Sequence, residues 1–355
     1  MTRGAVYMSG TKTTAIDLVE AAYNLEVGFS SFLPNLLEAG NRFLDRGLGF
    51  GGAVFAGFAE DGTYVTTQVA LSPGTPEDTL VKYAMANQEI GPEALADWVV
   101  ETTGIVRKVS DDDPKWRTRE IYSKHLGCKD ILEINAHDHD RHGFSLFVLS
   151  DEIVHLTPHE KARLERLAVH MAAGHRLQRA LAPQPDVSGS SMTDLPLDAE
   201  ALLDPKRFLV SELAGGAKDA AASQTIREAA VRVDRARGKL RKSDPDEALE
   251  IWHALVRGRW SLVDWFDTDG RRFVLAKPNA PKIEDPRGLT EREAQVATYA
   301  AQGESSKILG YRFGISPPRV SKLLNSAMRK LKVETQAQLV EKLGPFAKAA
   351  TPDED

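Results

Sequence analysis

The chain has 355 residues, of which 42% are hydrophobic and 27% are charged. This composition excludes a disordered, collagen-like or membrane-spanning protein, and the length predicts about two to three domains. The formal net charge of -6 argues against a protein that binds nucleic acid over its whole surface.

The charge is unevenly distributed along the chain. Residues 286–343 contain ten Lys or Arg and five Asp or Glu, a net of +5, so the remainder carries -11. A basic module attached to an acidic body indicates a local site for a polyanion.

Cysteine content and hydropathy both indicate the cytoplasm. The single cysteine, Cys128, excludes an intrachain disulfide framework and fits a reducing compartment. Apolar runs fall short of the roughly 20 residues that span a bilayer, and the first residues lack a signal-peptide core. We expect a cytoplasmic protein without a membrane partner.

The first third of the chain predicts helices and a hairpin. Residues 14–48 have an apolar stripe at helical spacing, and Gly47, Gly49, Gly51 and Gly52 are expected to break it. Two strand-like runs follow, joined at Asp61-Gly62, which is a strong hairpin signal.

A second set of elements completes the N-terminal domain. Helix is expected over much of 77–103 and over 116–126, then a hairpin over 130–150, then a long helix from Thr157-Pro158 with Glu160 at its third position. This order of elements resembles a GAF-like sensor and dimerisation domain over residues 14–182. Such a domain implies a small-molecule or protein effector. Six aromatic residues could line a ligand pocket, although aromatic residues at these spacings more often form a plain core: Phe55, Phe58, Tyr64, Trp98, Phe144 and Phe147.

Three features of this domain invite a chemical interpretation. The run HDHDRH at 137–142 offers metal-ligating side chains, but a hairpin tip spreads them apart, so a solvated turn is favoured and no metal is expected. His170 and His175 are five residues apart, which suits a surface or an interface better than a ligand pair. Cys128 lies near basic residues, yet the chain has no resolving cysteine for a redox sensor.

A linker over 183–198 separates this domain from a small α+β module over 199–280. Strands near Asp204-Pro205, helices over 219–241 and 246–257, and a hairpin turning at Asp269-Gly270 resemble a truncated PAS-like module. The first helix is basic, and its arginines suit either a second DNA contact or a solvated or inter-subunit face, of which we favour the latter.

The last module, residues 286–345, predicts four helices with clear boundaries. Thr290 and Glu293 form a capping box, Gly303 ends the first helix, and Ser305 begins the second. Gly314 ends the second helix, and Ser316-Pro317 starts the third. The second and third helices with the turn between them form a helix-turn-helix, and residues 346–355 form a disordered tail.

The third helix, over 317–331, has one apolar face and one polar face. The polar face carries Arg319, Lys322, Asn325 and Arg329, a set that suits hydrogen bonding to bases and phosphates. A lone amphipathic helix would favour a solvated face, but the helix-turn-helix context and the local positive charge favour recognition of DNA.

The whole module resembles the LuxR/GerE-type helix-turn-helix. The resemblance rests on LTEREAQV, Gly303, SSK, Gly314-Ile315-Ser316, Val320, RKLKV and the closing QAQLVEKL. Four residues depart from the family pattern: Ile308 replaces Glu, Gly310 replaces Ala, Arg319 replaces Thr, and Leu323 replaces a frequent His. Gly310 should weaken the second helix by about 1 kcal/mol relative to Ala.

The resemblance implies a set of DNA contacts and a bacterial dimer. By analogy, Ser321, Lys322 and Asn325 contact base edges, and the backbone is contacted by Lys307, Ser316, Arg319, Arg329 and Lys330. The fourth helix in such domains often mediates dimerisation, which implies paired half-sites.

Several other classes are disfavoured. The N-terminal half lacks the acidic residues and strand order of a phosphorelay receiver and the Trp-Tyr-Asp-Trp set of an acyl-homoserine-lactone domain. It also lacks a phosphate-binding glycine loop, a nucleophile elbow and a C-x-x-C motif, so neither an enzyme nor a cofactor is expected.

The sequence therefore predicts a multidomain α+β protein with an all-α, tetrahelical C-terminal domain. Its expected function is that of a dimeric, sequence-specific transcription regulator under the control of its front modules, with double-stranded DNA as partner and RNA polymerase as a further one. The alternative is a signalling scaffold whose helix-turn-helix contacts a protein, because Arg319 and Leu323 depart from the DNA-reading pattern.

Overall fold

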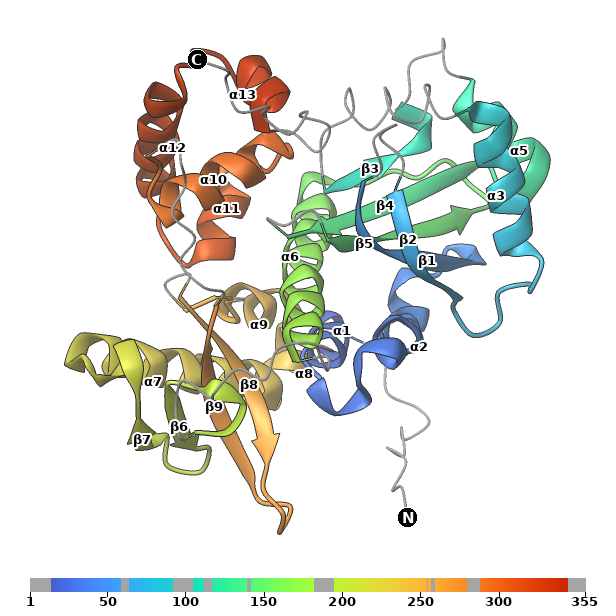
Figure 1. The fold of residues 1–355 in the computed structure, drawn as a ribbon. Helices are drawn as coiled ribbons and strands as arrows, with labels where there is room; N and C mark the ends of the chain where they lie inside the picture. Colours follow the sequence, from blue (N-terminus) through green and yellow to red (C-terminus); the bar gives the residue numbers. More distant parts are fainter. Residues whose placement is uncertain are drawn as a thin grey trace.

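A computed structural model describes residues 14–58, 64–91, 105–111, 117–138, 142–181, 195–253, 255–256, 259–279 and 288–343. In Figure 1 the long helix α6, Pro158–Leu181, runs through the middle of the molecule. An N-terminal domain with its sheet lies on one side, and the middle module and the C-terminal helices lie on the other. The protein is α+β, and no described helix is both long and apolar enough to cross a membrane.

The N-terminal domain is built on a five-stranded antiparallel sheet with the order β2-β1-β5-β4-β3. Both expected hairpins are present, as β1–β2 and β4–β5, with pairs such as Gly52↔Ala70 and Leu132↔Val148. The strands are β1 (Gly47–Phe58), β2 (Tyr64–Leu71), β3 (Val106–Lys108), β4 (Asp130–His137) and β5 (Gly143–Ser150).

Helices cover both faces of this sheet. One face is covered by α1 (Ala15–Ala22), α2 (Phe32–Leu44) and α6, and the other by α3 (Thr79–Ile90) and α5 (Thr118–Leu126). The continuous helix expected over 14–48 is interrupted. The 3-10 turns η1 (Leu25–Val27) and η2 (Phe29–Ser31) separate α1 from α2, because Gly28 has a positive φ of 68° between them.

The glycines that were expected to break the first helix lie inside β1 instead. A Cβ atom at Gly51 would lie 2.6 Å from Cζ of Phe147, and one at Gly52 would lie 2.6 Å from Cδ2 of Leu146. These glycines make room for large side chains of the neighbouring strand β5, so they belong to the sheet.

The start of α6 follows the predicted capping pattern. The backbone N–H of Thr157 donates to Glu160 at 2.9 Å, and the N–H of Glu160 donates to the Thr157 hydroxyl at 3.2 Å. Further along, Gly174 lets α6 approach α1 closely: a Cβ at this position would lie 2.0 Å from the carbonyl oxygen of Ala22.

The middle module has a four-stranded antiparallel sheet with the order β7-β6-β9-β8. Its helical part begins with α7, as predicted, but passes into a π-turn and ends with a helix α9 that is shorter than expected. Its elements are β6 (Ala201–Asp204), β7 (Leu209–Leu213), α7 (Ala220–Arg235), the π-turn η7 (Ala236–Leu240), α8 (Arg241–Ser243), α9 (Pro245–Ile251), β8 (Trp260–Phe266) and β9 (Arg272–Pro278).

The N-terminal domain and the middle module share one hydrophobic core, whereas the C-terminal helices have a core of their own. We call the first two together the body. The C-terminal helices are α10 (Glu291–Ala301), α11 (Ser306–Phe313), α12 (Pro317–Leu331) and α13 (Gln336–Leu343). Ile308 and Tyr311 of α11 belong to the core of the body, so α11 joins the two parts.

Candidate nucleic-acid interface

The predicted caps fix the helices of the C-terminal domain. Thr290 and Glu293 form the capping box of α10, with the Thr290 N–H donating to Glu293 Oε2 at 2.8 Å. The Ser305 hydroxyl accepts the N–H of Ile308 at 3.3 Å and begins α11. Gly314 ends α11 with a φ of 62°, a conformation that favours glycine.

The turn between α11 and α12 is tight. The N–H of Ile315 donates to the carbonyl of Gly310 at 3.0 Å, and a Cβ at residue 310 would lie 2.8 Å from the Ile315 carbonyl oxygen. The loss of helix propensity expected at Gly310 is therefore only one part of its effect. Its lack of a side chain also lets the chain turn back closely over α11.

The two faces of α12 are those that the sequence predicts. Val320, Ala327 and Leu331 are buried in the domain core, and Leu323, Leu324 and Met328 pack partly against it. The opposite face is exposed to solvent and carries the three predicted base-contacting side chains and two of the five predicted backbone-contacting ones: Arg319, Ser321, Lys322, Asn325 and Arg329.

A second basic group lies beside the start of α12. The pKa of Arg292 on α10 is lowered by its partial burial, raised by the neighbouring charge of Glu291, and lowered by the charges of Arg259 and Arg319. Arg292 therefore lies close enough to Arg319, where the exposed face begins, for their charges to interact. Arg292 is not among the DNA contacts that the sequence predicts.

Lys330 differs from the other predicted backbone contacts. Its ammonium group lies 2.6 Å from Glu293 Oε2 and 3.1 Å from the Gly288 carbonyl, so it ties α12 to the start of α10. Burial favours the neutral form of Glu293, but hydrogen bonds from Lys330, Ser326 and Thr290 outweigh it and lower the pKa of Glu293 to about 2.

The helix-turn-helix packs on the body through α11. The Tyr311 hydroxyl lies 2.6 Å from His170 Nε2 on α6, and it is within hydrogen-bond distance of the carbonyl oxygens of Leu249 and Trp252, at 2.5 and 2.8 Å. His170 is fully buried, so the expectation of a surface position is wrong and the expectation of an interface holds. Burial lowers the pKa of His170 to about 3, which keeps its imidazole neutral.

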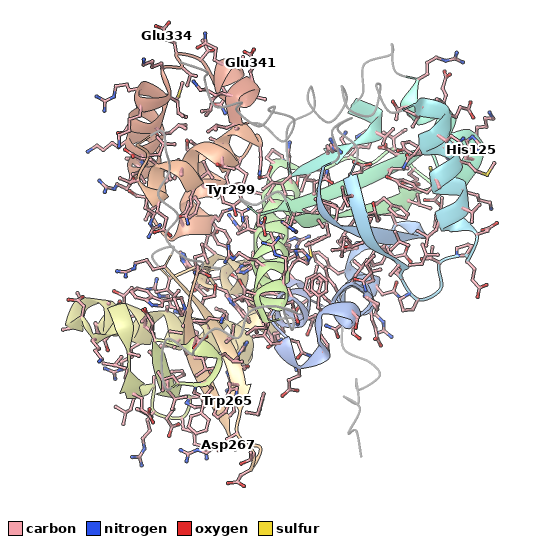
Figure 2. All side chains as sticks on the ribbon, viewed as in Figure 1. His125, Trp265, Asp267, Tyr299, Glu334 and Glu341 are labelled. Carbon is pink, nitrogen blue, oxygen red and sulfur yellow. The ribbon has the colours of Figure 1, made fainter. Side chains whose placement is uncertain are left out.

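A buried ion pair fixes the same helix within its own domain. Arg312 of α11 pairs with Glu304, and both side chains are almost completely buried. The guanidinium of Arg312 also lies 4.1 Å from the ring centre of Tyr299, on the side of α10 toward α6 in Figure 2. The departure at Ile308 has a similar basis, because this side chain packs in the core of the body, where the charge of a Glu would be costly.

These elements define a helix-turn-helix domain whose third helix presents a polar, basic face. Residues 287–343 match the family described as bacterial regulatory proteins, luxR family. The C-terminal part of the chain is therefore a LuxR-family helix-turn-helix domain, and this family implies a DNA-binding transcription regulator. A search of curated proteins finds no match to the chain.

The aromatic residues of the candidate ligand pocket do not gather at one place. Phe144 packs with Phe32 on the face of the sheet under α6, whereas Phe147 stacks on Tyr83 on the opposite face. Three residues of separation on a strand place the two side chains on opposite faces. Phe55 is buried, and Trp98 and the side chains of Phe58 and Tyr64 lie outside the described residues.

The remaining candidate sites of the N-terminal domain are held in structural contacts. Of the run HDHDRH, Asp138 accepts the backbone N–H of His142 at 3.0 Å and pairs with Arg179 of α6 at 2.9 Å, and residues 139–141 lie outside the described part. Burial raises the pKa of Cys128 to about 11, which keeps its thiol protonated and unreactive.

The basic helix of the middle module is largely neutralised within the chain. Arg235 pairs with Glu247 at 2.8 Å, and Arg241 lies 3.1 Å from Glu20 of α1. Arg237, in the π-turn, pairs with Asp264 at 2.7 Å. These pairs favour the structural interpretation of the helix over a second DNA contact.

Proposed function

We propose that this protein is a sequence-specific transcription regulator that inserts α12 into the major groove of DNA, binds as a homodimer, and is controlled by its body. The observation that carries the proposal is the exposed polar face of α12 in a domain of the luxR family. The domain packs on the body through α11, on the side away from the polar face of α12, so this face of α12 is open for DNA.

The residue roles follow from position along α12. Ser321, Lys322 and Asn325 are proposed to contact base edges, since they lie on the exposed face within the first nine residues of α12. The proposed backbone contacts surround them: Lys307, Ser316, Arg319, Arg329 and Lys330, to which we add Arg292. The pairing of Lys330 with Glu293 makes it the weakest contributor of this group.

Dimerisation is proposed to involve α13. This helix buries Leu339 in the domain core and exposes most of its other residues, and Figure 2 shows Glu341 pointing outward from it. A two-fold dimer places two copies of α12 on half-sites about one helical turn apart, so the bound sequence should be an inverted repeat.

The test is selection of bound fragments from genomic DNA with the full-length protein. We expect one two-fold symmetric motif. On that motif, Lys322→Ala and Asn325→Ala should each lose about 1–3 kcal/mol of binding free energy while changing binding to unrelated DNA much less. Lys82→Ala is the matched control, because Lys82 lies on α3 and also carries an exposed charge.

Two results would count against this proposal. Equal losses on specific and unrelated DNA would remove the base-reading role of both residues. Absence of any enriched sequence, together with a salt-insensitive complex with another protein, would favour the scaffold alternative.

A further inference from the structure

A cleft of about 430 Å³ opens where the N-terminal domain meets the middle module. We call it the junction cleft. It lies between the end of α1, the π-turn and the hairpin β8–β9, and its volume suits a small organic molecule. Its charged lining consists of Glu20, Glu26, Arg237, Asp264 and Arg272.

The wall of the junction cleft is organised around Arg237. This residue lies in the π-turn, where Gly238 departs from helical geometry with a ψ of -137°. Such turns occur frequently at functional sites because they redirect side chains. The Arg237 guanidinium lies 2.7 Å from Asp264 and 3.6 Å from Glu20, and 4.7 Å from the ring centre of Trp252.

The charged lining of the junction cleft has three carboxylates and two guanidinium groups, so one carboxylate is in excess. Asp264 pairs with both Arg237 and Arg272, at 2.7 and 3.1 Å. Glu20 lies 3.1 Å from Arg241 and 3.6 Å from Arg237, so it is not the carboxylate in excess. Glu26 is exposed and forms no ion pair within the described residues.

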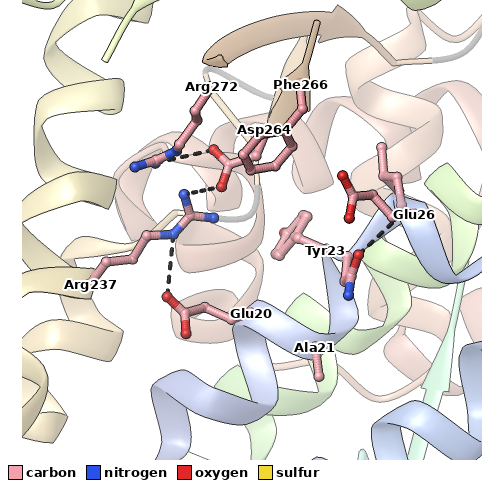
Figure 3. A pocket seen from close by; sticks show the side chains of 10 residues that line it. Glu20, Ala21, Tyr23, Glu26, Arg237, Asp264, Phe266 and Arg272 are labelled. Atoms are coloured by element: carbon pink, nitrogen blue, oxygen red, sulfur yellow. Dashed lines mark hydrogen bonds and ion pairs between the residues drawn. The ribbon is translucent and has the colours of Figure 1, made fainter. Parts of the chain in front are cut away.

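Two aromatic rings line the same opening. Phe266 is 43% exposed, whereas Tyr23 is buried, and Figure 3 shows both among the side chains that line the junction cleft. The Nε–H groups of Arg237 and Arg272 are enclosed in protein, and Nη1 of Arg237 and Nη2 of Arg272 pair with Asp264. A carboxylate beside an exposed aromatic ring suits an organic cation.

We propose that the junction cleft is an effector site for a small organic cation with an apolar or aromatic body. Its ammonium group would lie beside Glu26, and its body would pack on Phe266. The regulatory meaning of this site rests on the proposed function, whereas the binding itself does not.

A hydrogen-bonded chain connects the junction cleft to the DNA-binding domain. The Tyr23 hydroxyl lies 3.3 Å from His170 Nδ1, and His170 Nε2 lies 2.6 Å from the Tyr311 hydroxyl. When the single hydrogen of the Tyr311 hydroxyl goes to the carbonyl of Leu249 or Trp252, the neutral imidazole donates from Nε2 and accepts at Nδ1. Tyr23 also stacks on Trp252, with ring centres 6.0 Å apart.

This chain gives an occupant of the junction cleft a short path to α12. A cation that shifts Tyr23 or Arg237 also shifts the ring of Trp252 and the hydrogen bond to His170. The Trp252 carbonyl and the His170 imidazole both contact the Tyr311 hydroxyl on α11, and the tight turn after α11 leads directly into α12.

Binding is tested on the full-length protein by calorimetry with benzylammonium, with phenylacetate as the probe of opposite charge. We expect benzylammonium to bind and phenylacetate not to bind. Glu26→Gln should weaken benzylammonium about five-fold, and Phe266→Leu about three-fold. Glu38→Gln, an exposed position on α2, is the matched control and should change nothing.

Equal binding of the two probes, or equal affinity for benzylammonium in Glu26→Gln and Glu38→Gln, would overturn the proposed site. These measurements use no DNA, so they test the junction cleft even if the protein proves not to bind a specific sequence.

The regulatory part is tested by the affinity for the selected DNA with and without saturating benzylammonium. We expect a change of about five-fold or more, and Tyr311→Phe should reduce that ratio while leaving the calorimetric affinity for benzylammonium unchanged. Benzylammonium binding with an unchanged DNA affinity would overturn the effector role.

Discussion

Replacing Tyr311 by Phe tests whether the helix-turn-helix is seated on the body as the structure shows. The substitution keeps the ring and removes one hydroxyl, which has three partners at 2.5–2.8 Å. Its loss removes the hydroxyl partner of the buried His170 Nε2 and the donor of one of the two carbonyl oxygens. A buried polar group without a partner costs about 1–3 kcal/mol, so we expect a loss of that size in the free energy of unfolding.

The assay is urea unfolding of the full-length protein, combined with hydrogen exchange of the amides in α11. The amides of α11 should exchange faster in Tyr311→Phe, because the contact that holds this helix against α6 is weakened. Tyr299→Phe is the matched control: Tyr299 is equally enclosed, but its hydroxyl makes no hydrogen bond within the described residues. If the two variants lose stability equally, the Tyr311 hydroxyl does not hold the domain on the body.

Three further predictions follow from buried groups elsewhere. The pKa of His170 is about 3 in the folded protein and ordinarily 6.5, so the unfolded chain binds a proton more readily between these values. The free energy of unfolding should therefore fall as the pH is lowered from 6.5 toward 3. Between pH 7 and pH 5 the fall, measured by urea unfolding, should be about 2 kcal/mol smaller in His170→Asn than in the parent. Glu304→Gln leaves the buried Arg312 without a counter-charge and should cost about 3–5 kcal/mol in chemical unfolding, and a loss below 1 kcal/mol would contradict a buried pair. Gly174→Ala should lower the melting temperature, because the added Cβ would clash with the Ala22 carbonyl. This clash should outweigh the helix propensity of Ala, which exceeds that of Gly by about 1 kcal/mol. A higher melting temperature would show that α1 and α6 can move apart at no cost.

Elements whose boundaries depend on local chemistry could be predicted from the sequence. The capping pairs at Thr157 and Thr290 and the glycine at 314 act within a few residues, and the structure has helix ends at each. The two faces of α12 could also be predicted, because a period of 3.6 residues assigns each side chain to a face without knowledge of its partner.

Features that depend on contacts distant in the chain could not be predicted. His170 has the same neighbours in sequence whether it faces solvent or Tyr311, and the two residues are 141 positions apart. The glycines of β1 were expected to break a helix, because the side chains that leave no room for a Cβ there lie on another strand, such as Phe147 beside Gly51. The junction cleft likewise combines Glu20, Arg237 and Asp264, which no local pattern connects.

The departures from the family pattern acquire a physical meaning from these distant contacts. Ile308 lies beside Tyr311 on the side of α11 that packs on the body, and Gly310 lies under the turn into α12, so neither of these two departures faces the proposed DNA surface. A charged residue at position 308 suits a helix-turn-helix that is free in solvent, whereas an apolar one suits a domain docked on a partner. Arg319 and Leu323 lie on α12 itself, where Arg319 adds to the positive charge next to Arg292 and Leu323 packs partly against the core. The changes on α11 therefore suit the docking of the domain on its own body, and only Arg319 changes the surface that is proposed to meet DNA.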